Sequence, residues 1–434
     1  MLLFLILLIA PITVWSSIIN SFSDTNVKEF NHLTVDQIRG DVYVGAVNRL
    51  YHLSSQLEIL DETSTGPKDD SDDFNKVLVI DYNENGLIYC GSLQQTCEVY
   101  NLSNTREIFG KSKEKVVSEN QSASTIAFLG RGPSNGRQVM YVGVTFKPGA
   151  TILPAISSRT LNNKTFTLVT SEAKIDEGYS YFLTNQLKNT SSTQYVSKLV
   201  RVCQEDDSYY SYTEIPMICN KGDVNFNLAQ AAFVGKPGAK LAKELAITTK
   251  DSVLFVVFSE KESEKSNKPS NSSALCMYSL KYIRRKFIQN IQTCFSGKVE
   301  RGLDFITPSM PCFHTNLFIG DEFCGLDINT PFGGEDPITS VPIIQFNTTL
   351  TAVAANSVGD STMVYVGTAT GHLKKIIVDA DDNAVEYEDL LIEEDLAINS
   401  DLKFDHELKS LYVMTKNKIS KIQVDTVLKP RKKV

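Results

Sequence analysis

A hairpin-like alternation of apolar and polar residues recurs along the chain. It is clearest from Asp41 to Leu53 (DVYVGAVNRLYHL), where two alternating runs flank a turn that contains Gly45. Period-2 alternation on both sides of a turn is typical of a β-hairpin. Similar segments begin at Gly86, Gln138, Ser252, Met363 and Ser410. A hairpin that is repeated along a chain indicates an array of sheets or a propeller.

The spacing of these repeats favours a propeller. Most neighbouring anchors lie about 46 to 52 residues apart, near the ~40–50 residues of a four-stranded blade. Two gaps of about 110 residues flank Phe255; the first leaves room for one further blade. We expect its strands at Tyr179 to Leu183 and Tyr195 to Val202, whereas the second gap is predicted to be a blade with an insertion. The count could therefore be seven or eight, and we predict seven. The aromatic anchors are Tyr43, Tyr89, Tyr141, Phe255, Tyr365 and Tyr412.

The predicted fold is all-β, a seven-bladed β-propeller with an irregular insertion after the core strands of the fifth blade. The insertion is expected at about Lys281 to Thr339, with a short helix at Tyr282 to Ile291. The strand around Glu29 to Val35 is expected to complete the last blade beside Lys418 to Val424, because a closed ring leaves no open sheet edge. The domain is predicted to span residues 27–425, followed by a basic tail at 426–434.

Residues 1–17 are predicted to be a signal peptide. The apolar run Met1 to Val14 is too short to span a bilayer and is followed by the small residues Ser16 and Ser17. A basic N-terminal region is missing, so an uncleaved anchor is the alternative. Eight cysteines and six Asn-x-Ser/Thr sequons agree with an oxidising, extracellular location. The expected glycosylation sites are Asn101, Asn120, Asn163, Asn189, Asn271 and Asn347.

The sequence offers little support for an enzyme or a nucleic-acid-binding protein. A net charge of −8 disfavours binding to a polyanionic nucleic acid. None of the histidines lies in a zinc-binding motif, and neither a nucleophile elbow nor a phosphate-binding loop is present. The acidic segment after Asp379 departs from a calcium loop, because Ala384 and Leu390 stand where glycine and a bidentate glutamate are required. We therefore predict no catalytic residue, no metal site and no cofactor.

Several motifs follow one another along the chain: FNHLTVD from Phe30, YCGSLQQTC from Tyr89, VSKLVRVC from Val196, LAQAAFVGKPG from Leu228 and FCGLDINTPFGG from Phe323. Taken in this order, they resemble the sema domain of plexins, the receptors for semaphorins. The resemblance covers nearly the whole chain after the signal peptide. Sema domains of the hepatocyte growth factor receptor family share two of these regions in type, and semaphorins carry FF-x-RE where this chain has YFLTNQLKN near Tyr181; both families remain alternatives.

The chain also departs from the plexin pattern. Plexins usually have another cysteine pair soon after the TGP motif, and Lys68 to Lys76 contains none. A plexin continues into a cysteine-rich PSI module where this chain has its basic tail. We expect either a fragment of a receptor or a secreted ectodomain form.

The resemblance implies an extracellular, semaphorin-binding domain that acts in cell guidance, on the cell surface or secreted. A homo-oligomer through sema domains is a further option, and a semaphorin-like ligand or decoy is the alternative function. Eight cysteines allow roughly a hundred pairings, so spacing alone does not choose among them, although Cys90 and Cys97 suit a small loop. The pairs implied by the resemblance are Cys90–Cys97, Cys203–Cys324, Cys219–Cys276 and Cys294–Cys312.

The resemblance also implies that a semaphorin docks edge-on against the third and fourth blades, with the insertion contributing. Leu153 follows a turn-rich approach in that region, and His314 and Thr315 lie between two cysteines of the insertion. We expect these three residues to contact the partner. The alternative is that Leu153 belongs to the core and His314 is a surface residue without a role.

Overall fold

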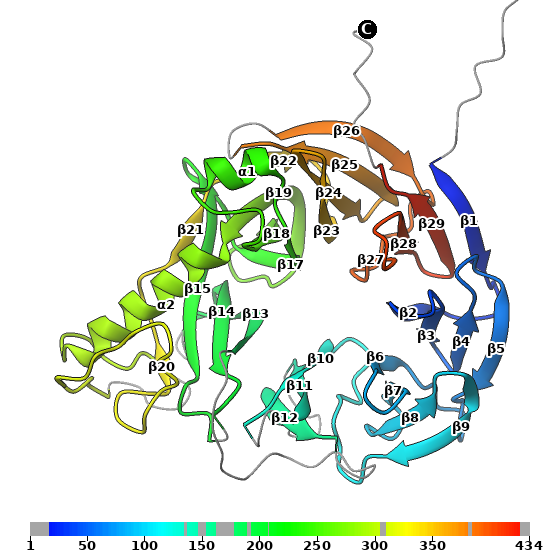
Figure 1. Ribbon diagram of the computed structural model, residues 1–434, viewed down its shortest axis with the longest axis horizontal. Coiled ribbons are helices and arrows are strands. Elements are labelled where there is room, and N and C mark those ends of the chain that lie inside the picture. The colour runs from blue at the N-terminus through cyan, green and yellow to red at the C-terminus, as the bar shows by residue number, and fades with distance from the viewer. Residues whose placement is uncertain are drawn as a thin grey trace, which may run out of the picture.

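Seven β-sheets follow one another round a ring in the computed structural model (Figure 1). The structure describes residues 17–425, apart from 134–136, 146–152, 162–177, 189–191, 207, 304–309 and 381–383. The predicted tail and all but the last residue of the predicted signal peptide lie outside the described residues. The prediction of a seven-bladed propeller is confirmed.

Neighbouring strands within a blade are antiparallel, except that β20 and β21 of the insertion pair parallel to β15. Blade 1 contains β2 (Phe30–Val35), β3 (Val42–Ala46), β4 (Arg49–Leu53) and β5 (Ile59–Ser64). Blade 2 contains β6 (Asn75–Asp81), β7 (Gly86–Gly91), β8 (Cys97–Asn101) and β9 (Asn104–Lys111). Blade 3 contains β10 (Thr125–Arg131), β11 (Gln138–Val144) and β12 (Ile156–Thr160). Blade 4 contains β13 (Tyr179–Leu187), β14 (Tyr195–Cys203), β15 (Thr213–Lys221) and β16 (Val224–Phe226), and the insertion adds β20 (Phe332–Gly333) and β21 (Ile338–Ser340) to it. Blade 5 contains β17 (Leu228–Gly235), β18 (Val253–Lys261), β19 (Pro269–Ser279) and β22 (Ile344–Phe346). Blade 6 contains β23 (Leu350–Val358), β24 (Ser361–Thr368), β25 (His372–Val378) and β26 (Ala384–Leu391). Blade 7 contains β27 (Lys403–Phe404), β28 (Ser410–Met414), β29 (Lys418–Gln423) and β1 (Ile18–Ser23).

The repeated hairpin of the sequence supplies the second and third strands of a blade. In blade 1 it forms β3 and β4, which are joined by a two-residue turn at Val47 and Asn48. Asn48 adopts the left-handed backbone conformation (φ 66°) that asparagine tolerates in turns. Its side-chain oxygen also accepts a hydrogen bond of 2.7 Å from the backbone N–H of Asp73, at the start of blade 2. The same turn thus connects β3 to β4 within blade 1 and is hydrogen-bonded to the start of blade 2.

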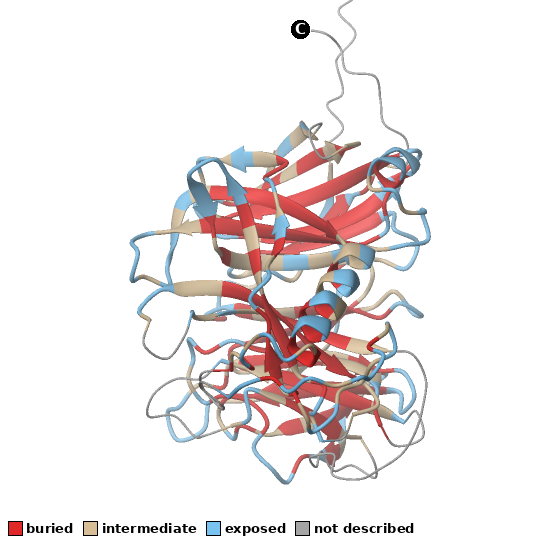
Figure 2. Ribbon diagram, turned by 90° about the vertical axis from the view of Figure 1, so that its left-hand side faces the viewer, coloured by how far each residue is buried: buried red, intermediate tan, exposed pale blue. Residues whose placement is uncertain are grey.

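The hydrophobic cores lie in the seams between neighbouring blades. At one seam, Tyr43 and Leu50 of blade 1 pack with Leu78 and Tyr89 of blade 2. The other seams are filled in the same way, and buried positions occupy the interior of the ring while exposed positions lie on its loops (Figure 2). The hydroxyl of the anchor Tyr43 donates to the carbonyl of Leu102 at 2.6 Å, and those of Tyr89, Tyr141 and Tyr412 also form hydrogen bonds. Each blade therefore depends on its neighbours for burial of its apolar faces.

The ring is closed by the N-terminal strand β1, which pairs with β29 and so completes blade 7. The expectation that residues 29–35 complete the last blade is therefore wrong, because Phe30–Val35 is the innermost strand of blade 1. The propeller also begins at Ile18, before the predicted start at residue 27. The reason is that β1 lies at an outer edge with four of its six residues exposed, so it carries no alternating apolar signal.

The insertion lies between the third and fourth strands of blade 5. It begins with α2 (Leu280–Phe295), which contains the predicted helix and extends beyond it. Ser279 caps this helix, since its hydroxyl accepts a hydrogen bond from the backbone N–H of Tyr282. Buried Ile283, Phe287 and Ile291 recur at four-residue intervals and form the face that packs inward. The long gap after Phe255 thus holds this insertion, which excludes an eighth blade.

A second, shorter helix, α1 (Ala239–Glu244), follows β17. Within the described part of the chain, neither α1 nor α2 is long and apolar enough to cross a bilayer.

Candidate partner-binding surface

Backbone pairing attaches the insertion to blade 4. β20 and β21 add to β15, with Thr213 opposite Phe332 and Met217 opposite Ile338. Close to these pairs, the N–H of Gly334 donates to the carbonyl of Glu214 at 2.8 Å. The insertion leaves blade 5 and extends the sheet of blade 4, so it bridges the two blades on the outside of the ring (Figure 1).

Three of the four disulfides lie at this junction. Cys203–Cys324 joins β14 to the insertion, and Cys219–Cys276 joins β15 of blade 4 to β19 of blade 5. Cys294–Cys312 ties the end of α2 to the chain that follows it, whereas Cys90–Cys97 closes a short loop in blade 2. These are the four pairs that the resemblance implies.

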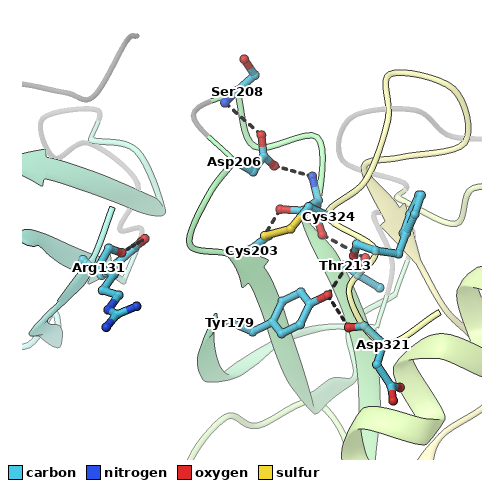
Figure 3. The surroundings of a disulfide bond; sticks show 11 residues. Arg131, Tyr179, Cys203, Asp206, Ser208, Thr213, Asp321 and Cys324 are labelled. Atoms are coloured by element: carbon cyan, nitrogen blue, oxygen red, sulfur yellow. Dashed lines mark hydrogen bonds between the residues drawn. A yellow bond between two sulfur atoms is a disulfide. The ribbon is translucent and has the colours of Figure 1, made fainter. Parts of the chain in front are cut away.

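Tyr179 holds the insertion beside the first of these disulfides (Figure 3). Its hydroxyl donates to the carbonyls of Asp321 and Phe323, at 2.8 and 3.0 Å. The ring of Tyr179 lies 4.2 Å from the guanidinium of Arg201, and the ring of Phe287 lies 4.9 Å from the same guanidinium. Arg201 is only 2% exposed, and burial lowers its pKa. A buried cation between two rings therefore joins blade 4 to α2.

The insertion also has a small core of its own. Ile291, Phe295, Ile319 and Phe332 are buried together with the Cys294–Cys312 disulfide. The side-chain amide of Asn329 accepts from the N–H of Phe313 at 2.6 Å and donates to its carbonyl at 2.7 Å. This amide replaces a neighbouring strand, because it satisfies both backbone groups of Phe313 where no ladder is available. The irregular segment is thus fixed in place without regular secondary structure.

Large apolar side chains are exposed on this fixed segment. Phe318 is 92% exposed, Phe313 56%, Leu317 52% and Met310 41%. We refer to these four residues as the apolar surface of the insertion. Aromatic and methionine side chains gathered on a rigid, exposed segment are typical of an interaction site.

The predicted contact residues lie on two different parts of the ring. His314 is exposed and Thr315 half-buried, and both belong to the same segment as the apolar surface. The N–H of Thr315 donates to the carbonyl of Phe295 at 2.9 Å, so the end of α2 positions them. Leu153 is half-buried and lies on blade 3, just before β12. The sequence did not point to Phe313, Leu317 and Phe318, because an aromatic residue in an aperiodic segment carries no sign of whether it is buried.

Four of the six sequons lie on described residues. Asn271 and Asn347 are exposed, whereas Asn101 and Asn120 are half-buried. Asn271 and Asn347 also lie close together, because the hydroxyl of Thr349, the third residue of the second sequon, donates to the side-chain oxygen of Asn271 at 3.3 Å. Asn163 and Asn189 lie outside the described residues.

No group of three or more histidine, cysteine, aspartate or glutamate side chains within the described ranges is arranged to hold a metal ion. One pocket among the described residues lies elsewhere, near the inner strands of blades 1 and 2, where the ammonium of Lys76 donates to the backbone carbonyls of Asn120, Gln121 and Ala123. Bonds of this kind position a loop, and the lining groups include no nucleophile–base pair.

Comparison with known proteins gives consistent matches. Residues 229–405 match the model of the Sema domain. Plexin-A4 of Homo sapiens is 31% identical over 481 residues, a match that covers 96% of this chain and 25% of that protein. Plexin A3 of Danio rerio is also 31% identical, with 91% of this chain and 25% of that protein covered. The chain therefore spans about a quarter of the length of the curated relatives that it matches.

Solved structures agree in fold. The Plexin A4 full extracellular region superposes with a TM-score of 0.84 and 30% identity, over 93% of this chain and 40% of that chain. A structure described as Drosophila Plexin A in complex with Semaphorin 1b gives 0.59 and 16%, over 94% and 87% of the two chains. The latter identity is low, so this second match supports the propeller architecture alone.

Proposed function

Because the chain belongs to the sema domains of the plexin family, we propose that it is the extracellular ligand-recognition domain of a plexin-type receptor and that its ligand is a semaphorin. The observation that carries this proposal is the 31% identity to a plexin across 96% of the chain. All eight cysteines are paired, which fits the oxidising compartment in which such a domain acts.

Rigidity of the insertion supports its role in docking. Its apolar surface is fixed by two disulfides, by β20 and β21 and by the Asn329 amide, so binding costs little additional ordering of the chain. Exposed Phe313 and Phe318 are the kind of side chains that fill pockets at the centre of protein interfaces. His314 and Thr315 lie among them and are proposed to contact the semaphorin, together with Leu153 on blade 3.

The proposed role is recognition of a protein, not catalysis. A propeller held by shared cores is a stiff disc, and its rim carries contact residues without a change of shape. The glycans proposed at Asn271 and Asn347 would shield the edge of blade 5 near β22. In the receptor, further domains would transmit the signal.

Binding of semaphorins to single-residue variants tests the proposal. We expect Leu153→Arg and His314→Glu each to weaken binding about tenfold or more, because a charge would enter an apolar contact worth ~2 kcal/mol. Surface plasmon resonance measures the affinity, and circular dichroism verifies the fold. His406→Glu is the matched control, since His406 is an exposed histidine on the hairpin turn of blade 7.

Each outcome separates the alternatives. If both variants bind like the parent, the docking face lies elsewhere on the ring. If Leu153→Arg fails to be secreted, Leu153 is a core residue. If the chain retains plexin ectodomains but no semaphorin from a panel, it acts as a semaphorin-like ligand and the receptor proposal is wrong.

A further inference from the structure

Helix α2 carries an exposed row of basic side chains. Lys281, Arg284 and Arg285 are exposed, and within the described part of the chain none of the three forms an ion pair. Lys286 differs, because its ammonium lies 2.8 Å from a carboxylate oxygen of Asp336. Residues three and four apart share one face of a helix, and like charges there destabilise it. The row is thus an unfavourable arrangement in a chain whose net charge is −8.

The basic row continues onto the neighbouring loop. The N–H of Leu280 donates to the carbonyl of Ser252 at 3.0 Å, which places the start of α2 against residues 250–252. Lys236 reaches the same loop, since its ammonium donates to the carbonyl of Lys250 at 2.6 Å. The pKa of Asp251 is lowered, mainly by hydrogen bonds from Thr248 and additionally by the charges of Lys281 and Lys236. We refer to Lys236, Lys250, Lys281, Arg284 and Arg285 as the basic strip.

Tyr181 and Arg201 of blade 4 lie against α2, beside one end of the basic strip, since the ring of Tyr181 lies 5.9 Å from the ring of Phe287. Burial raises the pKa of Tyr181, and the charges of Arg201 and Arg284 act in the opposite direction, so both cations are close to this hydroxyl. Arg284 and the buried Arg201 thus place two positive charges at this end of the basic strip.

We propose that the basic strip binds a sulfated polysaccharide of the extracellular surface, with Arg284 and Arg285 as its principal contacts. A row of long, mobile cations on a helix and the adjoining loop suits a linear polymer with many charges. A folded protein partner would instead call for an apolar centre with a polar rim. Figure 2 views the molecule from the side on which α2 lies, where the exposed turns of the helix face outward, so a polymer has access to the strip.

Binding of the secreted full chain to immobilised heparin, a densely sulfated polysaccharide, tests the proposal. We expect binding that weakens as salt is raised. Arg284→Glu/Arg285→Glu should weaken it about tenfold or more and lower the salt concentration at which the protein elutes. The control is Lys265→Glu/Lys268→Glu, which changes the net charge equally at an exposed turn of the same blade. The control should elute like the parent, and desulfated heparin should not bind.

Several results would overturn the proposal. It is wrong if the parent does not bind heparin, or if both charge-reversed variants lose binding equally, which would mean that net charge alone is responsible. Tighter binding of a polyglutamate peptide than of heparin, lost in the Arg284/Arg285 variant, would assign the strip to an acidic protein segment instead. Semaphorin binding is measured on the same variants, so failure of this proposal is distinguishable from failure of the proposed receptor function.

Discussion

The ring and its insertion are stabilised in different ways. Six of the seven blades contain no disulfide that begins and ends within them, and the ring is held by apolar cores shared across the seams. The insertion has few strands and one small core, but two disulfides end in it. Its backbone is satisfied by single side chains such as Asn329 and Tyr179. Repetition thus supplies stability in the ring, whereas the insertion depends on individual links.

This difference has a functional consequence. A seam is filled on both sides, so its side chains have no surface left for a partner. The insertion has only one small core, and Phe313 and Phe318 remain exposed on a backbone that is nonetheless fixed. Covalent links allow a segment to present apolar side chains that a disulfide-free loop of the same size could not hold in position.

Deletion of residues 18–23 should have the largest effect, because it opens the ring. β29 would keep β28 but lose its outer neighbour, and Phe22 would no longer stack on Phe30 at 5.9 Å and contact the edge of Tyr51 at 5.4 Å. We expect the loss to approach the ~5–15 kcal/mol that stabilises a domain, and hence no secretion of folded protein. Deletion of residues 426–434 is the control. Normal secretion with an unchanged melting temperature would show that β1 does not close the ring.

Replacement of Cys203 and Cys324 by serine should affect the insertion more than the ring. This disulfide joins residues 121 apart, so its loss should cost about 2–5 kcal/mol. Removal of Cys90–Cys97, with a separation of 7, should cost roughly 2 kcal/mol. Guanidinium unfolding measures both, and limited proteolysis should cleave the insertion first in the Cys203/Cys324 variant. A larger loss from the Cys90/Cys97 variant would contradict the comparison, as would peptide mapping that joins Cys203 to Cys219.

Asp401 gives the ring an electrostatic contact at its closing seam. Its carboxylate accepts from Nδ1 of His32 at 2.9 Å and from the N–H of Leu33 at 3.1 Å. Burial alone would raise the pKa of Asp401, but Lys403, His32 and the Leu33 N–H lower it well below its usual value. A lowered pKa in the folded state stabilises above the unfolded pKa near 4, and the contribution is lost as pH falls toward the folded value.

We therefore expect Asp401→Asn to lose about 1–2 kcal/mol at pH 7. The difference from the parent should shrink as pH falls below about 4. Urea unfolding across this pH range is the measurement, and Asp405→Asn serves as a control on the same blade. A difference that does not depend on pH would assign the loss to packing.

Tyr179→Phe should have the smallest effect, and it acts on the insertion. The substitution keeps the ring against Arg201 but removes the donor to the carbonyls of Asp321 and Phe323. We expect a loss of ~1 kcal/mol. Hydrogen exchange at residues 319–324 should rise while the seams stay protected. Tyr210→Phe is the control, since Tyr210 is 46% exposed; equal effects of the two variants would remove the role assigned to Tyr179.

The repeated unit, the number of blades and the position of the insertion could be predicted from the amino-acid sequence. Alternation around a turn is a local property, and the spacing of Tyr43, Tyr89 and Tyr141 carries the length of one blade. The capped, amphipathic helix α2 could be predicted for the same reason, because its periodicity lies within its own residues.

The strand that closes the ring and the side chains that remain exposed could not be predicted, because both depend on contacts between distant parts of the chain. β1 is an outer-edge strand whose pairing with β29 depends on residues some 400 positions away, and no local pattern encodes such a contact. The exposure of Phe318 and the burial of Arg201 likewise depend on what the rest of the chain places beside them. The alternation of apolar and polar residues predicts a strand from its own residues. The burial of a side chain and the closure of the ring depend instead on contacts between segments that are distant in the sequence.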